Sequence, residues 1–324
     1  GYNDGEVWLW PLDGEAPAPG HLLFEPNDLR TRIAVSPDGG RTVVGGWRSF
    51  NRLVSLSDGT SRALPGFEGP SGGVTFSPGG RLAAVQCDAL SPTGSVIRVW
   101  DVDTLEEVVV LDREEVLFPY DLEFTEEGTL LSGSVSGMLR IDVETGASEL
   151  LYEGIVGRFA SSADGRRIVM VESDKTLGYP GRAVFLDLDS GTSTRLDEYG
   201  YAVMLVALNR DGTVVAAADD TGEIRVGRVP DGEPHLLLGH EIETPSLAID
   251  PLGRWIASGD GNGVIRLWPM PDLSRPPLHT LPREELIAKL KTLTNLRVVR
   301  DETSATGWRL THDPFPGWET VPTW

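Results

Sequence analysis

The chain has 324 residues, of which 40% are hydrophobic, and its formal net charge is −21, from 28 Lys and Arg and 49 Asp and Glu. A chain of this length can bury a large core, and no run approaches the roughly 20 apolar residues that a bilayer-spanning helix needs. The negative charge opposes binding to nucleic-acid phosphates, and the single cysteine, Cys87, excludes an intramolecular disulfide framework. We therefore expect a cytoplasmic globular protein with no cofactor, no nucleic-acid partner and no membrane association.

Two short apolar segments, at residues 3–10 and about 21–25, open the chain and are followed by a unit that recurs six times. Each unit has a short apolar strand, a turn with glycine and a second apolar strand. The units occupy residues 34–46, 75–85, 123–133, 161–171, 207–218 and 248–259. Their turn glycines are 41, 48, 37, 47 and 41 residues apart, which is typical of one four-stranded blade of a β-propeller.

A third strand follows, and in four of the units it places an arginine between two apolar residues. These triplets are Ile97-Arg98-Val99, Leu139-Arg140-Ile141, Ile224-Arg225-Val226 and Ile265-Arg266-Leu267. Successive side chains of a strand point to opposite faces, so the two apolar side chains share a face that we expect to pack between blades. A fourth strand, such as Glu107–Leu111 or His235–Leu238, then closes the blade.

The six units and the opening fragment together predict an all-β fold, a seven-bladed β-propeller of four-stranded antiparallel blades over residues 1–281. The first blade is incomplete, because the fragment offers only a third and a fourth strand, and we expect that the N-terminus is truncated. Beyond Leu281 the apolar spacing becomes helical. It predicts a C-terminal extension over 282–324, with a helix at about 283–292 and then short strands, Leu296–Val299 and Trp308–Thr311, that pack as a hairpin on the propeller.

Tryptophans end three of the third strands, at Trp10, Trp100 and Trp268, and Trp100 is followed by Asp101. This Trp-Asp dipeptide is the signature of the WD-repeat (WD40) β-propellers, which the chain resembles. In the last unit the resemblance implies a structural tetrad of His240, Ser258, Asn262 and Trp268. Asn262 stands where the family has aspartate, and a neutral amide holds an imidazole less strongly than a carboxylate does, so we expect a weakened tetrad.

The tail resembles the C-terminal extension of bacterial WD-repeat proteins, among them serine/threonine protein kinases whose propeller follows the kinase domain. The chain itself has no Gly-rich phosphate loop followed by a strand lysine, no HRD and no DFG, which phosphoryl transfer in that family requires. The resemblance therefore implies an attached kinase domain upstream of Gly1, and a docking or regulatory role in signalling for this chain.

No catalytic or metal-binding set of residues is predicted. Gly69-Pro70-Ser71-Gly72-Gly73 matches a hydrolase nucleophile motif, but no helix follows it, so we interpret it as an inter-blade loop. The sequence favours a non-catalytic scaffold that binds a protein or peptide, with basic partners preferred because the chain is acidic. Aromatic and arginine residues of the loops are the candidate contacts, namely Trp47, Arg48, Phe50, Phe118, Tyr120, Tyr179, Tyr199 and Tyr201. Two alternatives remain open, a propeller hydrolase and a small-molecule sensor that uses the central channel.

Overall fold

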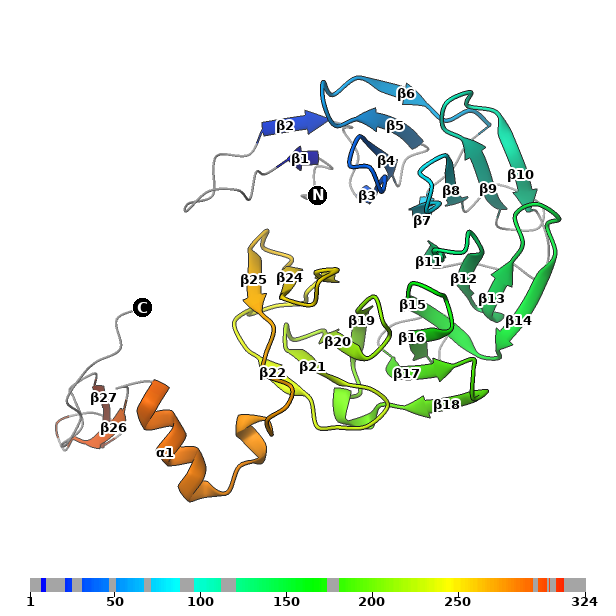
Figure 1. Cartoon of the computed structure of the whole chain (residues 1–324). Helices are drawn as coiled ribbons and strands as arrows, with labels where there is room; N and C mark the ends of the chain where they lie inside the picture. The colour runs from blue at the N-terminus through cyan, green and yellow to red at the C-terminus, as the bar shows by residue number, and fades with distance from the viewer. Residues whose placement is uncertain are drawn as a thin grey trace. The chain divides into compact units, whose positions relative to one another are not determined.

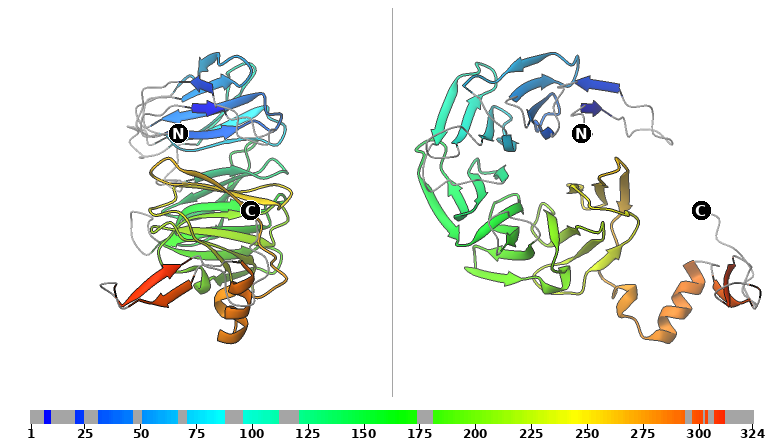
Figure 2. Two further views of the ribbon diagram at one scale, coloured as in Figure 1. Left: turned by 90° about the vertical axis from the view of Figure 1, so that its left-hand side faces the viewer. Right: turned by 180° about the vertical axis from the view of Figure 1, so that it is seen from behind.

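The computed structural model divides the chain into two compact units, Gly1–Pro271 and Asp272–Trp324. It describes residues 7–9, 21–24, 31–46, 51–66, 71–87, 96–111, 121–173, 181–293, 297–301, 303 and 307–311. The first unit is a β-propeller whose antiparallel sheets follow one another around a common axis, with the first strand of each sheet innermost (Figures 1 and 2).

Five of these sheets have four strands in the order of the chain, and we number them blades 1 to 5. Blade 1 contains β3 (Thr31–Val35), β4 (Arg41–Gly46), β5 (Asn51–Ser55) and β6 (Ser61–Ala63). Blade 2 contains β7 (Ser71–Phe76), β8 (Leu82–Cys87), β9 (Val96–Asp101) and β10 (Glu107–Leu111). Blade 3 contains β11 (Asp121–Phe124), β12 (Leu130–Ser134), β13 (Gly137–Ile141) and β14 (Ser148–Tyr152).

Blade 4 contains β15 (Ile155–Ser161), β16 (Arg167–Ser173), β17 (Arg182–Asp187) and β18 (Thr192–Arg195), and a short 3-10 helix, η2 (Asp197–Tyr199), follows it. Blade 5 contains β19 (Val203–Leu208), β20 (Val214–Asp219), β21 (Ile224–Arg228) and β22 (His235–Leu237). Blade 6 has three strands, β23 (Ser246–Ile249), β24 (Trp255–Gly259) and β25 (Ile265–Pro269).

The predicted number of seven blades is wrong, because the described residues form six. The opening fragment gives only a two-stranded pair, β1 (Val7–Leu9) and β2 (His21–Phe24). No described strand pairs with β1 on its other side, so the pair has no inner strands. A fourth strand was also expected in blade 6, but residues 270–281 instead form turns and a 3-10 helix. The repeat and the incomplete opening copy were therefore correctly predicted, and the number of blades and the fourth strand of blade 6 were not.

The turn that the repeat predicts between the first and second strands has the same backbone conformation in all six blades. Its glycine always has a positive φ, between 66° and 86°, where a side chain would be strained. The six glycines are Gly39, Gly80, Gly128, Gly165, Gly212 and Gly253. The recurrence of glycine at this position thus reflects one backbone requirement that is repeated in every blade.

Apolar side chains between neighbouring blades form the core. Ile97 and Val99 of blade 2 pack in one cluster with Leu122 and Leu130 of blade 3, and all four are at most 4% exposed. Fully burying a side chain of this kind contributes about 1.5–3 kcal/mol. Each blade therefore depends on its neighbours for stability, as repeat architectures do.

The second unit contains η3 (Leu278–Thr280), α1 (Arg283–Leu293) and an antiparallel pair, β26 (Arg297–Arg300) and β27 (Trp308–Thr311). Helix α1 follows Pro282 and carries Glu284 and Glu285 in its first turn, where acidic side chains favour a helix. The unit begins ten residues before the predicted boundary, since the structure divides after Pro271 and the sequence divides after Leu281. Within the described residues, no helix has the length and apolar character needed to cross a membrane.

Candidate functional site

A chain of side-chain hydrogen bonds joins three segments of blade 6. Nδ1 of His240, which precedes the blade, lies 2.9 Å from Oδ2 of Asp260, in the turn after β24. Nε2 of His240 lies 2.7 Å from Oγ of Ser258 on β24. The indole Nε1 of Trp268 on β25 donates to the same Oγ at 2.8 Å. These bonds hold the entry to the blade, its second strand and its third strand in one arrangement.

The chemistry of these four side chains indicates which ring nitrogen of His240 carries the proton. An indole N–H only donates, so Oγ of Ser258 accepts from Trp268 and has its own hydrogen free to donate to Nε2 of His240. The ionised Asp260 can only accept, so Nδ1 carries the proton that is donated to it, and in the neutral imidazole Nε2 is then the acceptor for the serine hydroxyl. Buried polar groups are costly without partners, and here both ring nitrogens and the hydroxyl are satisfied within the protein.

The prediction that Asn262 is the fourth member of the tetrad is wrong, because Asp260 occupies that place. Asn262 is exposed, and its backbone N–H donates to Oδ1 of Asp260 at 3.0 Å. Asp260 lies two residues before Asn262, and the turn of this blade brings the earlier residue to the imidazole. The tetrad therefore has the carboxylate whose absence led us to expect a weak interaction.

Asp260 is held ionised in this position. Burial opposes its charge, but the backbone N–H of Val264, the ring of His240 and the backbone N–H of Asn262 together hold its pKa below the ordinary value. The distances are 2.9 Å from the N of Val264 and 3.0 Å from the N of Asn262, both to Oδ1. One carboxylate oxygen thus orders the turn while the other orients the histidine.

The predicted partner-binding loops are only partly described. Trp47, Arg48, Phe50, Phe118, Tyr120 and Tyr179 lie outside the described residues. Tyr201 is 69% exposed, and the guanidinium of Arg182 lies 4.7 Å from the centre of its ring. Tyr199 is only 2% exposed and packs in the cluster between blades 4 and 5, so its assignment as a loop contact is wrong. It belongs to η2, which folds it back onto the core.

Ser71 of the hydrolase-like motif is the first residue of β7, and it is buried. Residues 67–70, which carry the start of the motif, lie outside the described part of the chain. A search of the described residues for three or more His, Cys, Asp or Glu side chains that are placed to hold a metal ion finds no such group.

Blade 6 differs from the other blades in the exposure of its third strand. In the first three Arg-containing triplets the two apolar side chains are 0–4% exposed. In the triplet of β25, Ile265 is 66% exposed and Leu267 is 51% exposed. Nearby, Leu252 is 72% and Trp255 is 44% exposed. Sequence reasoning missed this surface, because the triplet has the same apolar-Arg-apolar pattern in all four blades and the difference lies in its neighbours in space.

The outer edge of β25 is also unpaired among the described strands. In blade 2 the triplet arginine, Arg98, pairs with Glu107 of the fourth strand at 2.7 Å, and in blade 3 Arg140 pairs with Glu149 at 2.5 Å. The equivalent Arg266 has no carboxylate partner in the described part of the chain, and its guanidinium lies 5.8 Å from the centre of the Trp268 ring. Blade 6 therefore presents backbone groups and an arginine that the fourth strand satisfies in blades 2 and 3. It also presents apolar side chains whose equivalents in blade 2, Ile97 and Val99, pack against the next blade.

The comparison with protein families points to the same blade. The family model for the WD domain, G-beta repeat, matches residues 233–269, which run from the end of blade 5 through blade 6 and include the tetrad. Apoptotic protease-activating factor 1 of Rattus norvegicus is 31% identical over 147 residues, which are 44% of this chain and 11% of that protein. Lipoprotein LpqB of Rhodococcus opacus (strain B4) and that of Rhodococcus jostii (strain RHA1) are each 35% identical over 104 residues, 30% of this chain and 17% of those proteins.

The fold places the chain in the class of β-propellers, and its residues 233–269 match a WD repeat. The predicted resemblance to this class is confirmed by the match over residues 233–269 together with the propeller of antiparallel blades. WD propellers typically act as scaffolds for protein interaction. The chain spans less than a fifth of each relative that it matches.

Proposed function

We propose that this chain is a non-catalytic protein-interaction module, and that an extended segment of its partner adds to β25 as the fourth strand of blade 6. The observation that carries the proposal is the combination of an unpaired strand edge with exposed Ile265 and Leu267. Soluble proteins usually protect strand edges, because an open edge is a template for pairing with another chain. Strand addition of this kind is a recurrent mode of peptide recognition.

The chemistry of the partner segment follows from the complete blades. A strand that lies antiparallel to β25 would place one side chain near Arg266, as Glu149 lies opposite Arg140 in blade 3. The aliphatic side chain that follows it would lie opposite Ile265, as Leu150 lies opposite Leu139 in blade 3. We therefore propose a partner segment in which an acidic residue is followed by apolar ones, as Glu149 is followed by Leu150 and Leu151 in β14.

The charge of the whole chain acts at longer range. A net charge of −21 attracts a partner whose overall charge is positive, even though its docking segment carries one carboxylate. Screening acts over about 8–10 Å at physiological salt, so this attraction affects the association rate. The association rate of a basic partner should therefore fall as salt is added, and a rate indifferent to salt would remove the steering proposal.

The docking proposal is tested with a synthetic peptide that has the sequence of β14, Ser148–Tyr152, flanked by lysines, and with fluorescence anisotropy as the readout. We expect the chain to bind it, and Arg266→Glu to weaken binding by about fivefold, since cross-strand pairs contribute up to about 1 kcal/mol. A peptide with lysine in place of the glutamate should reverse this order and bind the Arg266→Glu variant better. Ile265→Asp should weaken both peptides.

Arg254→Glu is the matched control, because Arg254 is an exposed arginine of the same blade that already pairs with Asp250 at 3.1 Å. It makes the same charge change away from the edge of β25. The proposal is wrong if Arg254→Glu and Arg266→Glu have equal effects, or if the unaltered chain binds neither peptide.

We further propose that the module is the docking or regulatory part of a larger bacterial signalling protein in the cytoplasm, with an attached kinase domain. The resemblance of the tail supports this, as does the small share of the relatives' lengths that the chain covers. The test is the complete reading frame that encodes the chain. A Gly-rich phosphate loop, HRD and DFG upstream would support the kinase, and a secretion signal or a frame without these motifs would overturn it.

A further inference from the structure

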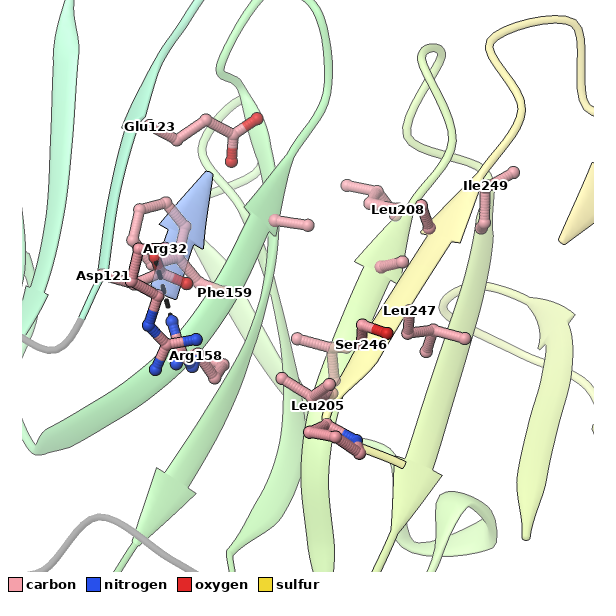
Figure 3. A pocket seen from close by; sticks show the side chains of 15 residues that line it. Arg32, Asp121, Glu123, Arg158, Phe159, Leu205, Leu208, Ser246, Leu247 and Ile249 are labelled. Atoms are coloured by element: carbon pink, nitrogen blue, oxygen red, sulfur yellow. Dashed lines mark ion pairs between the residues drawn. The ribbon is translucent and has the colours of Figure 1, made fainter. Parts of the chain in front are cut away.

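A cavity of about 410 Å³ lies among the inner strands of the propeller, and its walls differ in chemistry. Arg32, Asp121, Glu123 and Arg158, from β3, β11 and β15, line one side. Leu205 and Leu208 of β19 and Leu247 and Ile249 of β23 line the other, and Figure 3 shows the two sets facing each other across the space. The volume lies within the range of small-molecule sites, which usually combine an apolar lining with a few polar groups.

The charged wall has more guanidinium groups than carboxylates that pair with them. Arg158 is only 9% exposed, and its Nη1 lies 3.4 Å from Oδ1 of Asp121, a long contact that engages one of its N–H groups. Arg32 acts on the same carboxyl, yet within the described residues no carboxylate lies within ion-pair distance of it. Two guanidinium groups thus share one nearby carboxylate, and some of their N–H groups can donate to a bound ligand.

Glu123 does not supply the missing negative charge at neutral pH. Burial raises its pKa to about 8, against the opposing effect of Ser161, whose backbone N–H donates to Oε2 at 2.9 Å. Asp121, whose pKa burial raises to about 6, remains ionised at pH 7. The wall at pH 7 therefore has two positive groups, one negative group and one carboxyl with a proton to donate.

We propose that the cavity binds a small amphipathic carboxylic acid, with its carboxylate on Arg32 and Arg158 and its apolar part against Leu205, Leu247 and Ile249. A bound carboxylate accepts charge-assisted hydrogen bonds from the guanidinium groups. The neutral Glu123 carboxyl donates to it instead of repelling it. The negative net charge of the chain slows the approach of an anion, but it is largely screened beyond about 10 Å and does not cancel contacts inside the cavity.

The test compares three probes that share one ring and differ in charge: indole-3-acetate, indole-3-acetamide and tryptamine. Isothermal titration calorimetry of the full chain at pH 7 should show binding of indole-3-acetate, with the neutral amide roughly tenfold weaker and the cationic tryptamine weaker still. Tighter binding of tryptamine, equal binding of acid and amide, or no binding of any probe would each overturn the proposal.

Variants of the charged wall distinguish binding at this site from non-specific binding elsewhere on the protein. Arg32→Gln and Arg158→Gln should each weaken indole-3-acetate about tenfold, and Leu247→Ser should weaken the acid and the amide alike. Arg166→Gln is the matched control, since Arg166 is an exposed arginine that pairs with Asp189 at 2.5 Å. Arg32 is only partly buried, so its variant remains informative if Arg158→Gln does not fold. Unchanged affinity in Arg32→Gln would contradict the site.

The pH dependence gives an independent readout. Raising the pH from 7 to 9 ionises Glu123, which lines the cavity with Asp121, Arg32 and Arg158, and should weaken the acid because two carboxylates then oppose it. Glu123→Gln should bind indole-3-acetate at pH 7 and lose this dependence. A weakening that is the same in the unaltered chain and in Glu123→Gln would show that Glu123 does not contact the ligand.

Discussion

Nδ1 of His240 lies 2.9 Å from Oδ2 of Asp260, twenty residues further along the chain. The pair joins the segment before blade 6 to the turn between its second and third strands. Because Asp260 also accepts from two backbone N–H groups, the imidazole and the turn depend on one carboxylate.

Asp260→Asn should therefore lower the thermal midpoint of unfolding, since an amide supplies a weaker acceptor for the ring. Asn262→Ala should have little effect, because the side chain of Asn262 is exposed and only its backbone reaches Asp260. Differential scanning calorimetry of both variants measures this. A larger drop in the thermal midpoint for Asn262→Ala than for Asp260→Asn would mean that Asn262, and not Asp260, is the fourth member of the tetrad.

Ser258→Ala should lower the free energy of unfolding by about 1–3 kcal/mol. The change leaves Nε2 of His240 and Nε1 of Trp268 without their shared partner in a buried place, and unsatisfied buried groups are costly. Urea unfolding followed by tryptophan fluorescence provides the value. Ser274→Ala is the control, because Ser274 is an exposed serine that bonds only to Asp272 locally.

The stability of the propeller should fall as the pH rises from about 5 to 8.5, in part because of Glu123. Its pKa is raised to about 8 in the folded chain, from an ordinary value of 4.5, so the folded state holds a proton that the unfolded state has lost. Stability from this group is complete below the unfolded pKa and is lost through the folded pKa. Asp121, raised to about 6, acts in the same direction at lower pH.

Urea unfolding at several pH values should show a shallower decline in Glu123→Gln than in the unaltered chain. The amide keeps the shape of the carboxyl and has no proton to lose, so other groups contribute equally to both proteins. Parallel curves would mean that Glu123 is not neutral in the folded state.

Tyr199→Phe should leave the stability unchanged or raise it by up to about 1 kcal/mol, because the buried hydroxyl of Tyr199 has no hydrogen-bond partner among the described residues. Tyr199→Ala should cost about 3–5 kcal/mol, as the loss of a buried aromatic ring does. Tyr201→Ala is the exposed comparison and should change stability little. Chemical denaturation of the three variants distinguishes a core role for Tyr199 from the surface role that its sequence suggested.

The sequence alone predicted the blade, because the strands of one blade follow each other directly along the chain. Alternation of apolar residues, a glycine that requires a positive φ and a spacing of 37–48 residues are all visible in the letters. Five complete blades and most of a sixth follow from them. The helix α1 was visible for the same reason, in the change from alternating to helical spacing after Leu281.

The tertiary structure decided what depends on neighbours in space. Ile265 and Leu267 have the same pattern as Ile97 and Val99, yet they are exposed, and no described strand pairs with the outer edge of β25. Asn262 was predicted in place of Asp260, because only the path of the turn shows which of the two side chains reaches His240. Arg32, Asp121, Glu123 and Arg158 come from three separate blades, so no stretch of sequence shows that they share a cavity. The periodicity of the sequence determines the strands and turns of each blade. The arrangement of the blades around a common axis determines which side chains are buried, exposed or brought together.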